Sequence, residues 1–334
     1  MDFFDILRNA WFVLIGVLFA GYSILDGFDL GVGMLTPFIA KDDGKKSILI
    51  NSIWPVWDGN EVWLLTGAGA LFAAFPMAYA TVFSGFYLMF MLILFALIFR
   101  AVSLEFWYHD ISRRKIWAGA FTIGSFLPPL LLGIILGNII LGVPLNAAFQ
   151  FFGDLTTIFR PFAVVIGIFA LVLMIVHGAV YIILKTEGEL QEKARIVAGR
   201  LWIFLLIIFF ISAISMFLFA TGSISNKLVW TSCVLSFILL MVLRYSIGNN
   251  KDSLSFILSS LIFLTSWLCV GALLYPNLLK GINNQNLTIY NASSSQLTLT
   301  IMLIIALIGM PIVIGYTIFV YRVFKGKAKE KLHN

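Results

Sequence analysis

Nine long apolar runs divide the 334-residue chain, and they limit its fold more than any other feature. A helix that crosses a bilayer needs roughly 20 mostly apolar residues. The composition agrees, because 61% of the residues are hydrophobic and 11% are charged, whereas soluble domains carry about 25% charged residues. The sequence therefore predicts an all-α, polytopic membrane protein that forms a single integral membrane domain over residues 1–334. The nine predicted transmembrane helices are 9–36, 48–74, 78–104, 117–141, 160–184, 200–221, 228–247, 254–275 and 297–323.

Lysine and arginine are distributed unequally between the two sets of loops. Cytoplasmic loops of membrane proteins collect these residues, which predicts a cytoplasmic C-terminus and an N-terminus outside. The cations lie in short loops and not on one solvated face, which argues against a nucleic-acid partner. Seventeen cations share the side of the C-terminus: Lys41, Lys45, Lys46, Arg113, Arg114, Lys115, Lys185, Lys193, Arg195, Arg200, Arg244, Lys251, Arg322, Lys325, Lys327, Lys329 and Lys331. Four lie on the other side: Arg8, Arg160, Lys227 and Lys280.

Six charged residues interrupt the first three apolar runs. A charge at the centre of a membrane helix costs about 3 kcal/mol on insertion scales, so such residues are usually buried, paired or functional. The predicted topology places all six in the cytoplasmic half of the membrane or near its middle. If the second run is one continuous helix counted from Ser47, Asp58 lies about 16 Å along it. The six residues are Asp26 and Asp29, Asp58 and Glu61, and Arg100 and Glu105.

Two interpretations of this acidic cluster stay open at the level of sequence. Arg100 keeps its charge, so it is expected to pair with one of the carboxylates, and Glu105 is expected in the same ion-pair network. In the first interpretation the cluster is a proton or cation path, with Asp26 and Asp29 at a cytoplasmic entrance and Asp58 deeper. In the second, it is a buried ion-pair network that fixes helix packing.

The chain has three histidines, His109, His177 and His333, and only His177 lies within an apolar run. Membrane haems need axial ligands, commonly His or Met. His177 is the single candidate for a cofactor ligand, although a packing role is the simpler interpretation. No spacing of Cys or His is typical of a metal site. The sequence therefore predicts neither a bound haem nor a metal site, and no catalytic residue, in this chain.

Seven segments, in order along the chain, resemble subunit II of cytochrome bd quinol oxidases. The short connections and the Asn-Glu pair after Asp58-Gly resemble the cyanide-insensitive branch of that family. The segments are Gly27-Phe-Asp-Leu-Gly-Val-Gly33, Trp57-Asp-Gly-Asn-Glu-Val-Trp-Leu64, Phe83-Ser-Gly-Phe-Tyr87, Gly124-Ser-Phe-Leu-Pro-Pro129, His177-Gly-Ala179, Leu287-Thr-Ile-Tyr-Asn-Ala-Ser-Ser-Ser-Gln-Leu-Thr-Leu299 and Pro311-Ile-Val-Ile-Gly-Tyr-Thr-Ile-Phe-Val-Tyr-Arg322.

This resemblance implies a place in aerobic respiration. The complex in such a family oxidises quinol and reduces dioxygen to water in the bacterial cell (inner) membrane. Subunit I carries two b-type haems and haem d, and subunit II is a haem-free partner that stabilises it. Subunit II has two four-helix bundles plus one peripheral helix. A small accessory subunit, and a quinone or lipid in the pocket expected by symmetry with subunit I, are components that the resemblance leaves open.

The resemblance also implies roles for single residues. The family's cytoplasmic proton channel runs along the subunit interface and includes the Asp of the Trp-Asp-Gly motif, which is Asp58 here. Asp29 and Arg100 match family positions that lie near one another, and Glu61 stands where some members have Gln. Two rival functions remain: a proton-coupled secondary transporter that uses the same acidic cluster, and an assembly subunit without a proton role.

Overall fold

A computed structural model of the chain describes residues 2–220, 222–282 and 285–329. Lys331 and His333, named above, lie outside this range. Helices dominate it, because in lipid every backbone N–H and C=O must find a partner within the protein. The helices are α1 (Phe3–Ile39), α2 (Asp43–Ile53), α3 (Trp57–Ala74), α4 (Pro76–Gly85), α5 (Tyr87–His109), the 3₁₀ turn η1 (Ile111–Arg113), α6 (Arg114–Leu141), α7 (Leu155–Ile158), α8 (Pro161–Lys185), α9 (Gly188–Phe219), α10 (Lys227–Gly248), α11 (Asp252–Leu274) and α12 (Gln296–Val323). Strands β1 (Asn277–Leu279) and β2 (Leu287–Thr288) pair antiparallel.

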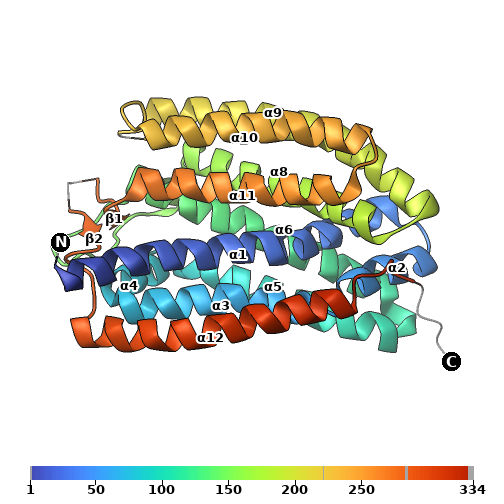
Figure 1. Ribbon diagram of the computed structural model, residues 1–334, viewed down its shortest axis with the longest axis horizontal. Coiled ribbons are helices and arrows are strands. Elements are labelled where there is room, and N and C mark those ends of the chain that lie inside the picture. The colour runs from blue at the N-terminus through green and yellow to red at the C-terminus, as the bar shows by residue number, and fades with distance from the viewer. Residues whose placement is uncertain (1, 221, 283–284, 330–334) are drawn as a thin grey trace.

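Eight helices in the described part of the chain are long and apolar enough to cross a membrane. They are α1, α5, α6 with η1, α8, α9, α10, α11 and α12. They run along the longest axis of the molecule and make the fold an all-α bundle (Figure 1). Seven of the nine predicted apolar runs coincide with these helices. The third, 78–104, is divided between α4 and α5, which meet at Phe86, and the second, 48–74, is divided between α2 and α3.

The predicted continuous helix over 48–74 is broken in the structure. Helix α2 ends at Ile53 and α3 begins at Trp57. Pro55 lies between them, and a proline cannot donate the helical N–H bond and clashes with the preceding turn. The prediction that Asp58 lies midway along one long helix is therefore wrong, because Asp58 lies in the first turn of α3.

Helix α1 lies at the centre of the bundle and packs against α3, α6, α8 and α11. Its crossing with α8 depends on two glycines, since a Cβ atom added to Gly31 would overlap the backbone of Met174 and Gly178. Membrane helices have no hydrophobic force between them, and small residues allow the close packing that replaces it.

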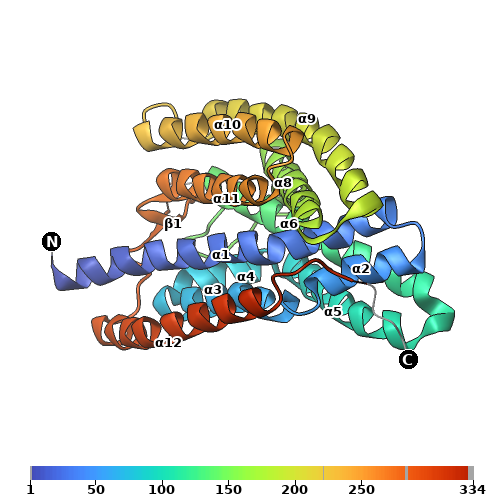
Figure 2. The same cartoon turned by 45° about the vertical axis from the view of Figure 1, so that its right-hand side comes forward.

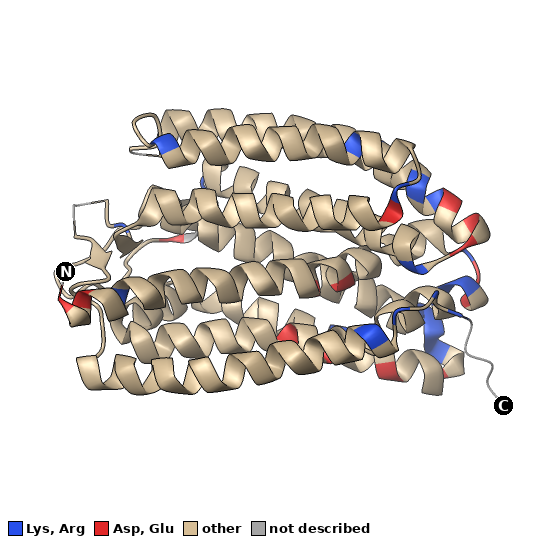
Figure 3. Cartoon of the chain, viewed as in Figure 1, with Lys and Arg blue, Asp and Glu red and all other residues tan. Residues whose placement is uncertain are grey.

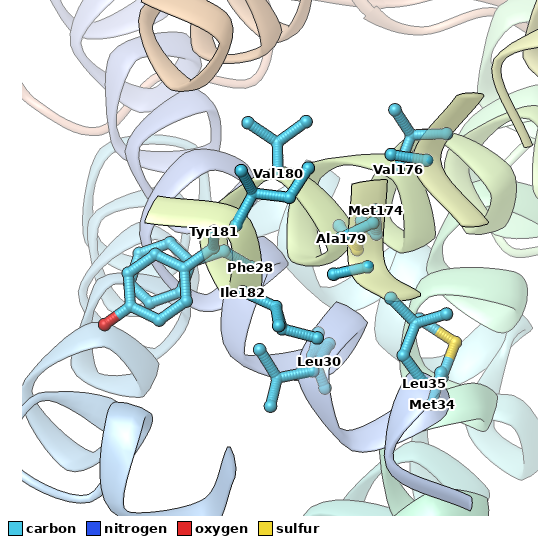
Figure 4. Packing of buried hydrophobic residues seen from close by; sticks show 14 of the residues in the cluster. Phe28, Leu30, Met34, Leu35, Met174, Val176, Ala179, Val180, Tyr181 and Ile182 are labelled. Carbon is cyan, nitrogen blue, oxygen red and sulfur yellow. The ribbon is translucent and has the colours of Figure 1, made fainter. Parts of the chain in front are cut away.

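Aromatic side chains join α1, α2 and α8 beside this crossing. The rings of Phe28 and Tyr181 stack with their centroids 4.0 Å apart (Figure 4). The Tyr181 hydroxyl donates a hydrogen bond of 2.7 Å to the Ser52 carbonyl on α2. Figure 4 also shows Leu30 and Ile182 among the apolar side chains near this contact. The second half of α1 is thereby fixed at the centre of the bundle.

Helix α12 lies on the outside of the bundle, where it contacts α1 and α3 (Figure 2). Only 6% of its most apolar window is buried, so most of its side chains face lipid or another subunit. Two contacts hold it: the Trp11 indole donates to the Leu299 carbonyl at 3.0 Å, and the Tyr321 hydroxyl donates to Asn60 Oδ1 at 3.0 Å.

Charged residues gather at the end of the bundle that carries the C-terminus (Figure 3). Ion pairs there connect α2 to α9, through Lys45 and Glu189 at 2.8 Å, and α9 to α11, through Arg195 and Asp252 at 2.8 Å. Partly exposed pairs of this kind contribute little to stability. Their position is more informative, because it marks this end of the bundle as a membrane–water boundary.

Candidate functional site

Three helices bring charged residues together inside the bundle. Arg100 on α5 is fully buried, and its Nη2 lies 2.8 Å from Asp26 Oδ1 on α1. Its Nη1 lies 3.5 Å from Glu61 Oε2 on α3. The Glu61 side chain is 22% exposed, whereas that of Asp26 is completely buried. Arg100 therefore joins an inner carboxylate to one that reaches the protein surface.

A hydrogen-bonded chain adjoins this ion pair. Asn60 Nδ2 donates to Asp29 Oδ2 at 2.7 Å, and the Tyr321 hydroxyl donates to Asn60 Oδ1. Asp29 and Asn60 are both buried. The amide of Asn60 thus connects a carboxylate on α1 to the peripheral helix α12.

The site lies deep in the bundle. Asp26 precedes the end of α1 at Ile39 by 13 residues, which is about 20 Å at the helical rise. Arg100 precedes the end of α5 at His109 by nine residues, or about 14 Å. The cluster therefore lies well inside the bundle, in the half that contains the end of α1 and the end of α5.

Several polar atoms of the cluster have no hydrogen-bond partner within the described residues. They include one oxygen of Asp29 and the Nε of Arg100. The Arg100–Asp26 contact, at 2.8 Å, is a short ion pair. A buried polar atom without a partner costs about 1–3 kcal/mol, so the cluster is chemically suited to bind water.

Asp58 lies at the edge of the cluster and not within it. It is exposed, and among the described residues it makes no hydrogen bond or ion pair. Helix α3 runs away from the charged end of the bundle. Asp58 precedes Glu61 by about one turn and therefore lies nearer that end. Arg100, which was expected to pair with one of the carboxylates of the cluster, is bound to Asp26 and Glu61.

Two further predictions about the cluster are wrong. Asp26 and Asp29 were expected at an entrance, but both are 0% exposed. Glu105 was expected in the ion-pair network, but it is exposed and forms no salt bridge in the part of the chain that the structure describes. Glu105 is five residues from Arg100, which at 3.6 residues per turn places it about 140° around α5.

His177 is buried on α8 and engaged through both ring nitrogens. Nδ1 lies 2.7 Å from Ser259 Oγ, and Nε2 lies 3.0 Å from the Ile24 carbonyl. The ring also stacks on Phe256 with centroids 4.9 Å apart. A haem ligand needs one free nitrogen, so this environment does not fit a haem iron.

Sequence reasoning missed three polar members of the site: Tyr22, Asn60 and Tyr321. Tyr22 lies four residues before Asp26, which is the spacing of neighbours on one helix face. Asn60 lies between two acidic residues in an apolar run, and this position could have indicated that its amide belongs to the polar site. Tyr321 lies beside Asn60 because of the way α12 packs on the bundle, and no local sequence pattern predicts that packing.

Comparison with known proteins decides the family. The model of the family "Cytochrome bd terminal oxidase subunit II" matches residues 7–324. The chain belongs to this family. It is 33% identical to the cytochrome bd-I ubiquinol oxidase subunit 2 of Escherichia coli K12, over 98% of this chain and 97% of that one. It is 34% identical to the cytochrome bd ubiquinol oxidase subunit 2 of Bacillus subtilis 168, over 97% and 98%.

The fold of the family is shared as well. A chain in the structure of the bd oxidase from Geobacillus thermodenitrificans superposes with a TM-score of 0.81 at 18% identity, covering 95% of this chain and 98% of that one. The resemblance inferred from the seven sequence segments is confirmed. The chain is thus an integral membrane subunit of a bd-type quinol oxidase, an oxidoreductase complex.

Proposed function

We propose that this chain is the haem-free subunit II that stabilises the haem-bearing subunit I and contributes a cytoplasmic proton path for reduction of dioxygen to water. The observation that carries the proposal is the buried cluster of Asp26, Glu61 and Arg100 well inside the bundle. Asp58 supports it, because it is an exposed carboxylate one turn from Glu61 on the same helix.

The proton path runs from the surface inward. Asp58 lies where α3 begins and faces away from the chain, as expected for a residue at the interface with subunit I. Glu61 is next, followed by Asp26 and Asp29 in the interior. These carboxylates outnumber the single guanidinium of Arg100, and unpaired charge is unfavourable in a low-dielectric interior. The cluster is therefore suited to exchange protons, with water completing its hydrogen bonds.

The transmembrane topology is part of the proposal. The segment α2–α3 is a ninth, broken span, which restores the odd number that the loop cations require. The N-terminus is outside and the C-terminus is cytoplasmic. Helices α1–α6 form one four-helix bundle, α8–α11 form the second, and α12 is peripheral.

Reporter fusions test this topology. Periplasm-active reporters fused after residues 75, 150 and 285 are expected to be active, and fusions after 45, 115 and 190 are expected to be silent. The reverse pattern would contradict the cytoplasmic placement of the lysine-rich end. If the fusions after residues 45 and 75 gave the same result, both active or both silent, α2–α3 would not cross the membrane.

An apolar cavity of about 370 Å³ lies between α1, α6, α8, α9, α10 and α11. Ser212 supplies a polar atom without a hydrogen-bond partner within the described residues, and Trp267 lies on the cavity wall. We propose that this cavity holds the isoprenoid tail of a structural quinone or a lipid chain. Quinol is then the substrate of the complex, and a small accessory subunit is compatible with the exposed face of α12.

Purification of the chain with and without its partner tests the proposed function. The isolated chain is expected to show no Soret band, because both nitrogens of His177 are engaged. The chain extracted from its native membrane is expected to co-purify with a haem-bearing subunit and to show the band. A stoichiometric Soret band in the isolated chain, lost in His177→Ala, would overturn the haem-free assignment. Substrate-driven proton transport by the isolated chain would favour a secondary transporter.

A further inference from the structure

A second polar site lies outside the acidic cluster, at the lysine-rich end of the bundle. It is a groove of about 390 Å³ between the end of α1, the start of α2 and the first turns of α6. Lys41, Lys46 and Lys115 stand at its rim. None of these residues takes part in the proposed proton path, so the groove needs a separate explanation.

The lysines at the rim are poorly neutralised. Lys41 Nζ donates a hydrogen bond to the Pro37 carbonyl at 3.4 Å, and Lys115 makes no hydrogen bond or ion pair within the described residues. Lys46 lies 3.4 Å from Asp43, but Arg114 lies at the same distance from that carboxylate. The rim therefore presents an excess of positive charge that an anion can satisfy.

The body of the groove is apolar and follows α6 into the membrane. From Lys115 to Ile123 is eight residues, about 12 Å of helix. Gly119 lies between them, and a Cβ added there would meet nothing within 4 Å. The Ile123 side chain, at the far end, is 62% exposed. A basic rim is thus continuous with an open apolar track that leads toward the hydrocarbon core.

We propose that this groove binds one anionic phospholipid. The headgroup phosphate lies among Lys41, Lys46 and Lys115, and an acyl chain lies along α6 over Gly119. Basic pockets between transmembrane helices at the membrane surface recognise anionic lipids in this way. A free phosphate ion would leave the apolar track unused, and an acidic protein surface would satisfy only the rim.

Native mass spectrometry of the full-length protein, with its co-purifying subunit, tests the proposal. The sample is taken from nanodiscs of equal parts phosphatidylglycerol and phosphatidylcholine. The wild type is expected to retain one phosphatidylglycerol. In the double variant Lys41→Gln/Lys115→Gln, the fraction of complexes that carry this lipid is expected to fall at least fivefold. The control Arg200→Gln/Lys325→Gln, which removes two exposed cations elsewhere at this end, is expected to retain it.

A steric pair separates a lipid from a free anion. Gly119→Leu fills the track without changing charge and is expected to lose the phosphatidylglycerol. Gly309→Leu, at an equally open glycine on α12, is expected to keep it. Retention by both the lysine and the Gly119 variants would overturn the proposal. So would loss in the lysine variant alone combined with displacement by inorganic phosphate, because the site would then bind a free anion. Both outcomes are independent of oxygen-reductase activity.

Discussion

Replacing Arg100 by Gln is expected to destabilise the chain by about 3–5 kcal/mol, because it leaves buried carboxylates without their cation. Asp26 and Glu61 both lose their ion-pair partner, and Asp26 has no exposure to solvent. The expected result is a large drop in the amount of assembled complex and in its thermal unfolding temperature. Size-exclusion chromatography in detergent and haem content measure assembly, and a thermal melt of the purified complex measures the unfolding temperature.

A matched set of variants tests the physical reason. Arg100→Gln/Asp26→Asn removes both members of the closest pair, so it is expected to recover much of the stability lost in the single variant. Arg200→Gln removes an exposed cation on α9 and is expected to behave as the wild type. If Arg100→Gln assembles and unfolds as the wild type does, the ion pair is not important for the structure.

Quinol-driven oxygen uptake is expected to fall by about tenfold or more in Asp58→Asn, because the loss of a positioned proton-transfer group typically costs 10²–10⁴ in rate. The substitution keeps the size and polarity of the side chain but removes its ability to titrate. Asp58 is exposed and makes no ion pair among the described residues, so assembly and haem content are expected to be unchanged. An oxygen electrode measures the rate.

Two further variants provide controls for this prediction. Asp58→Glu keeps a titratable group and is expected to retain more activity than Asp58→Asn. Glu105→Gln removes another exposed carboxylate near the same end of the bundle and is expected to turn over as the wild type does. Equal losses in Asp58→Asn and Glu105→Gln would point to a general effect of surface charge and against a specific relay.

Much of this architecture is predictable from the sequence, because the membrane restricts a chain so strongly. Long apolar runs predicted the spanning helices, since lipid leaves few other ways to satisfy the backbone. The lysine-rich loops predicted that the first and third runs end at the same membrane–water boundary. That placement predicted that Arg100 would pair with one of the carboxylates of the cluster, and in the structure it pairs with Asp26, which is 74 residues away in sequence.

The features that the sequence did not predict depend on local breaks and on packing between distant helices. Pro55 was present as a signal for a helix break, yet the apolar run around it suggested continuity. Because of this break, Asp58 lies in the first turn of α3 and not midway along one long helix, as the sequence had predicted. The contact of Tyr321 with Asn60 depends on where the peripheral helix α12 lies, which hydropathy does not determine.

Proton uptake during a single turnover shows directly whether Asp58 relays protons. The complex is reconstituted in vesicles with a pH-sensitive dye on the side of the lysine-rich end, reduced, and mixed with oxygen. We expect the haems of the Asp58→Asn complex to be reduced at the wild-type rate, and the complex to take up protons from that side at least about tenfold more slowly than the wild type. Proton uptake at the wild-type rate in a fully assembled Asp58→Asn complex would contradict it and leave the acidic cluster with a structural role.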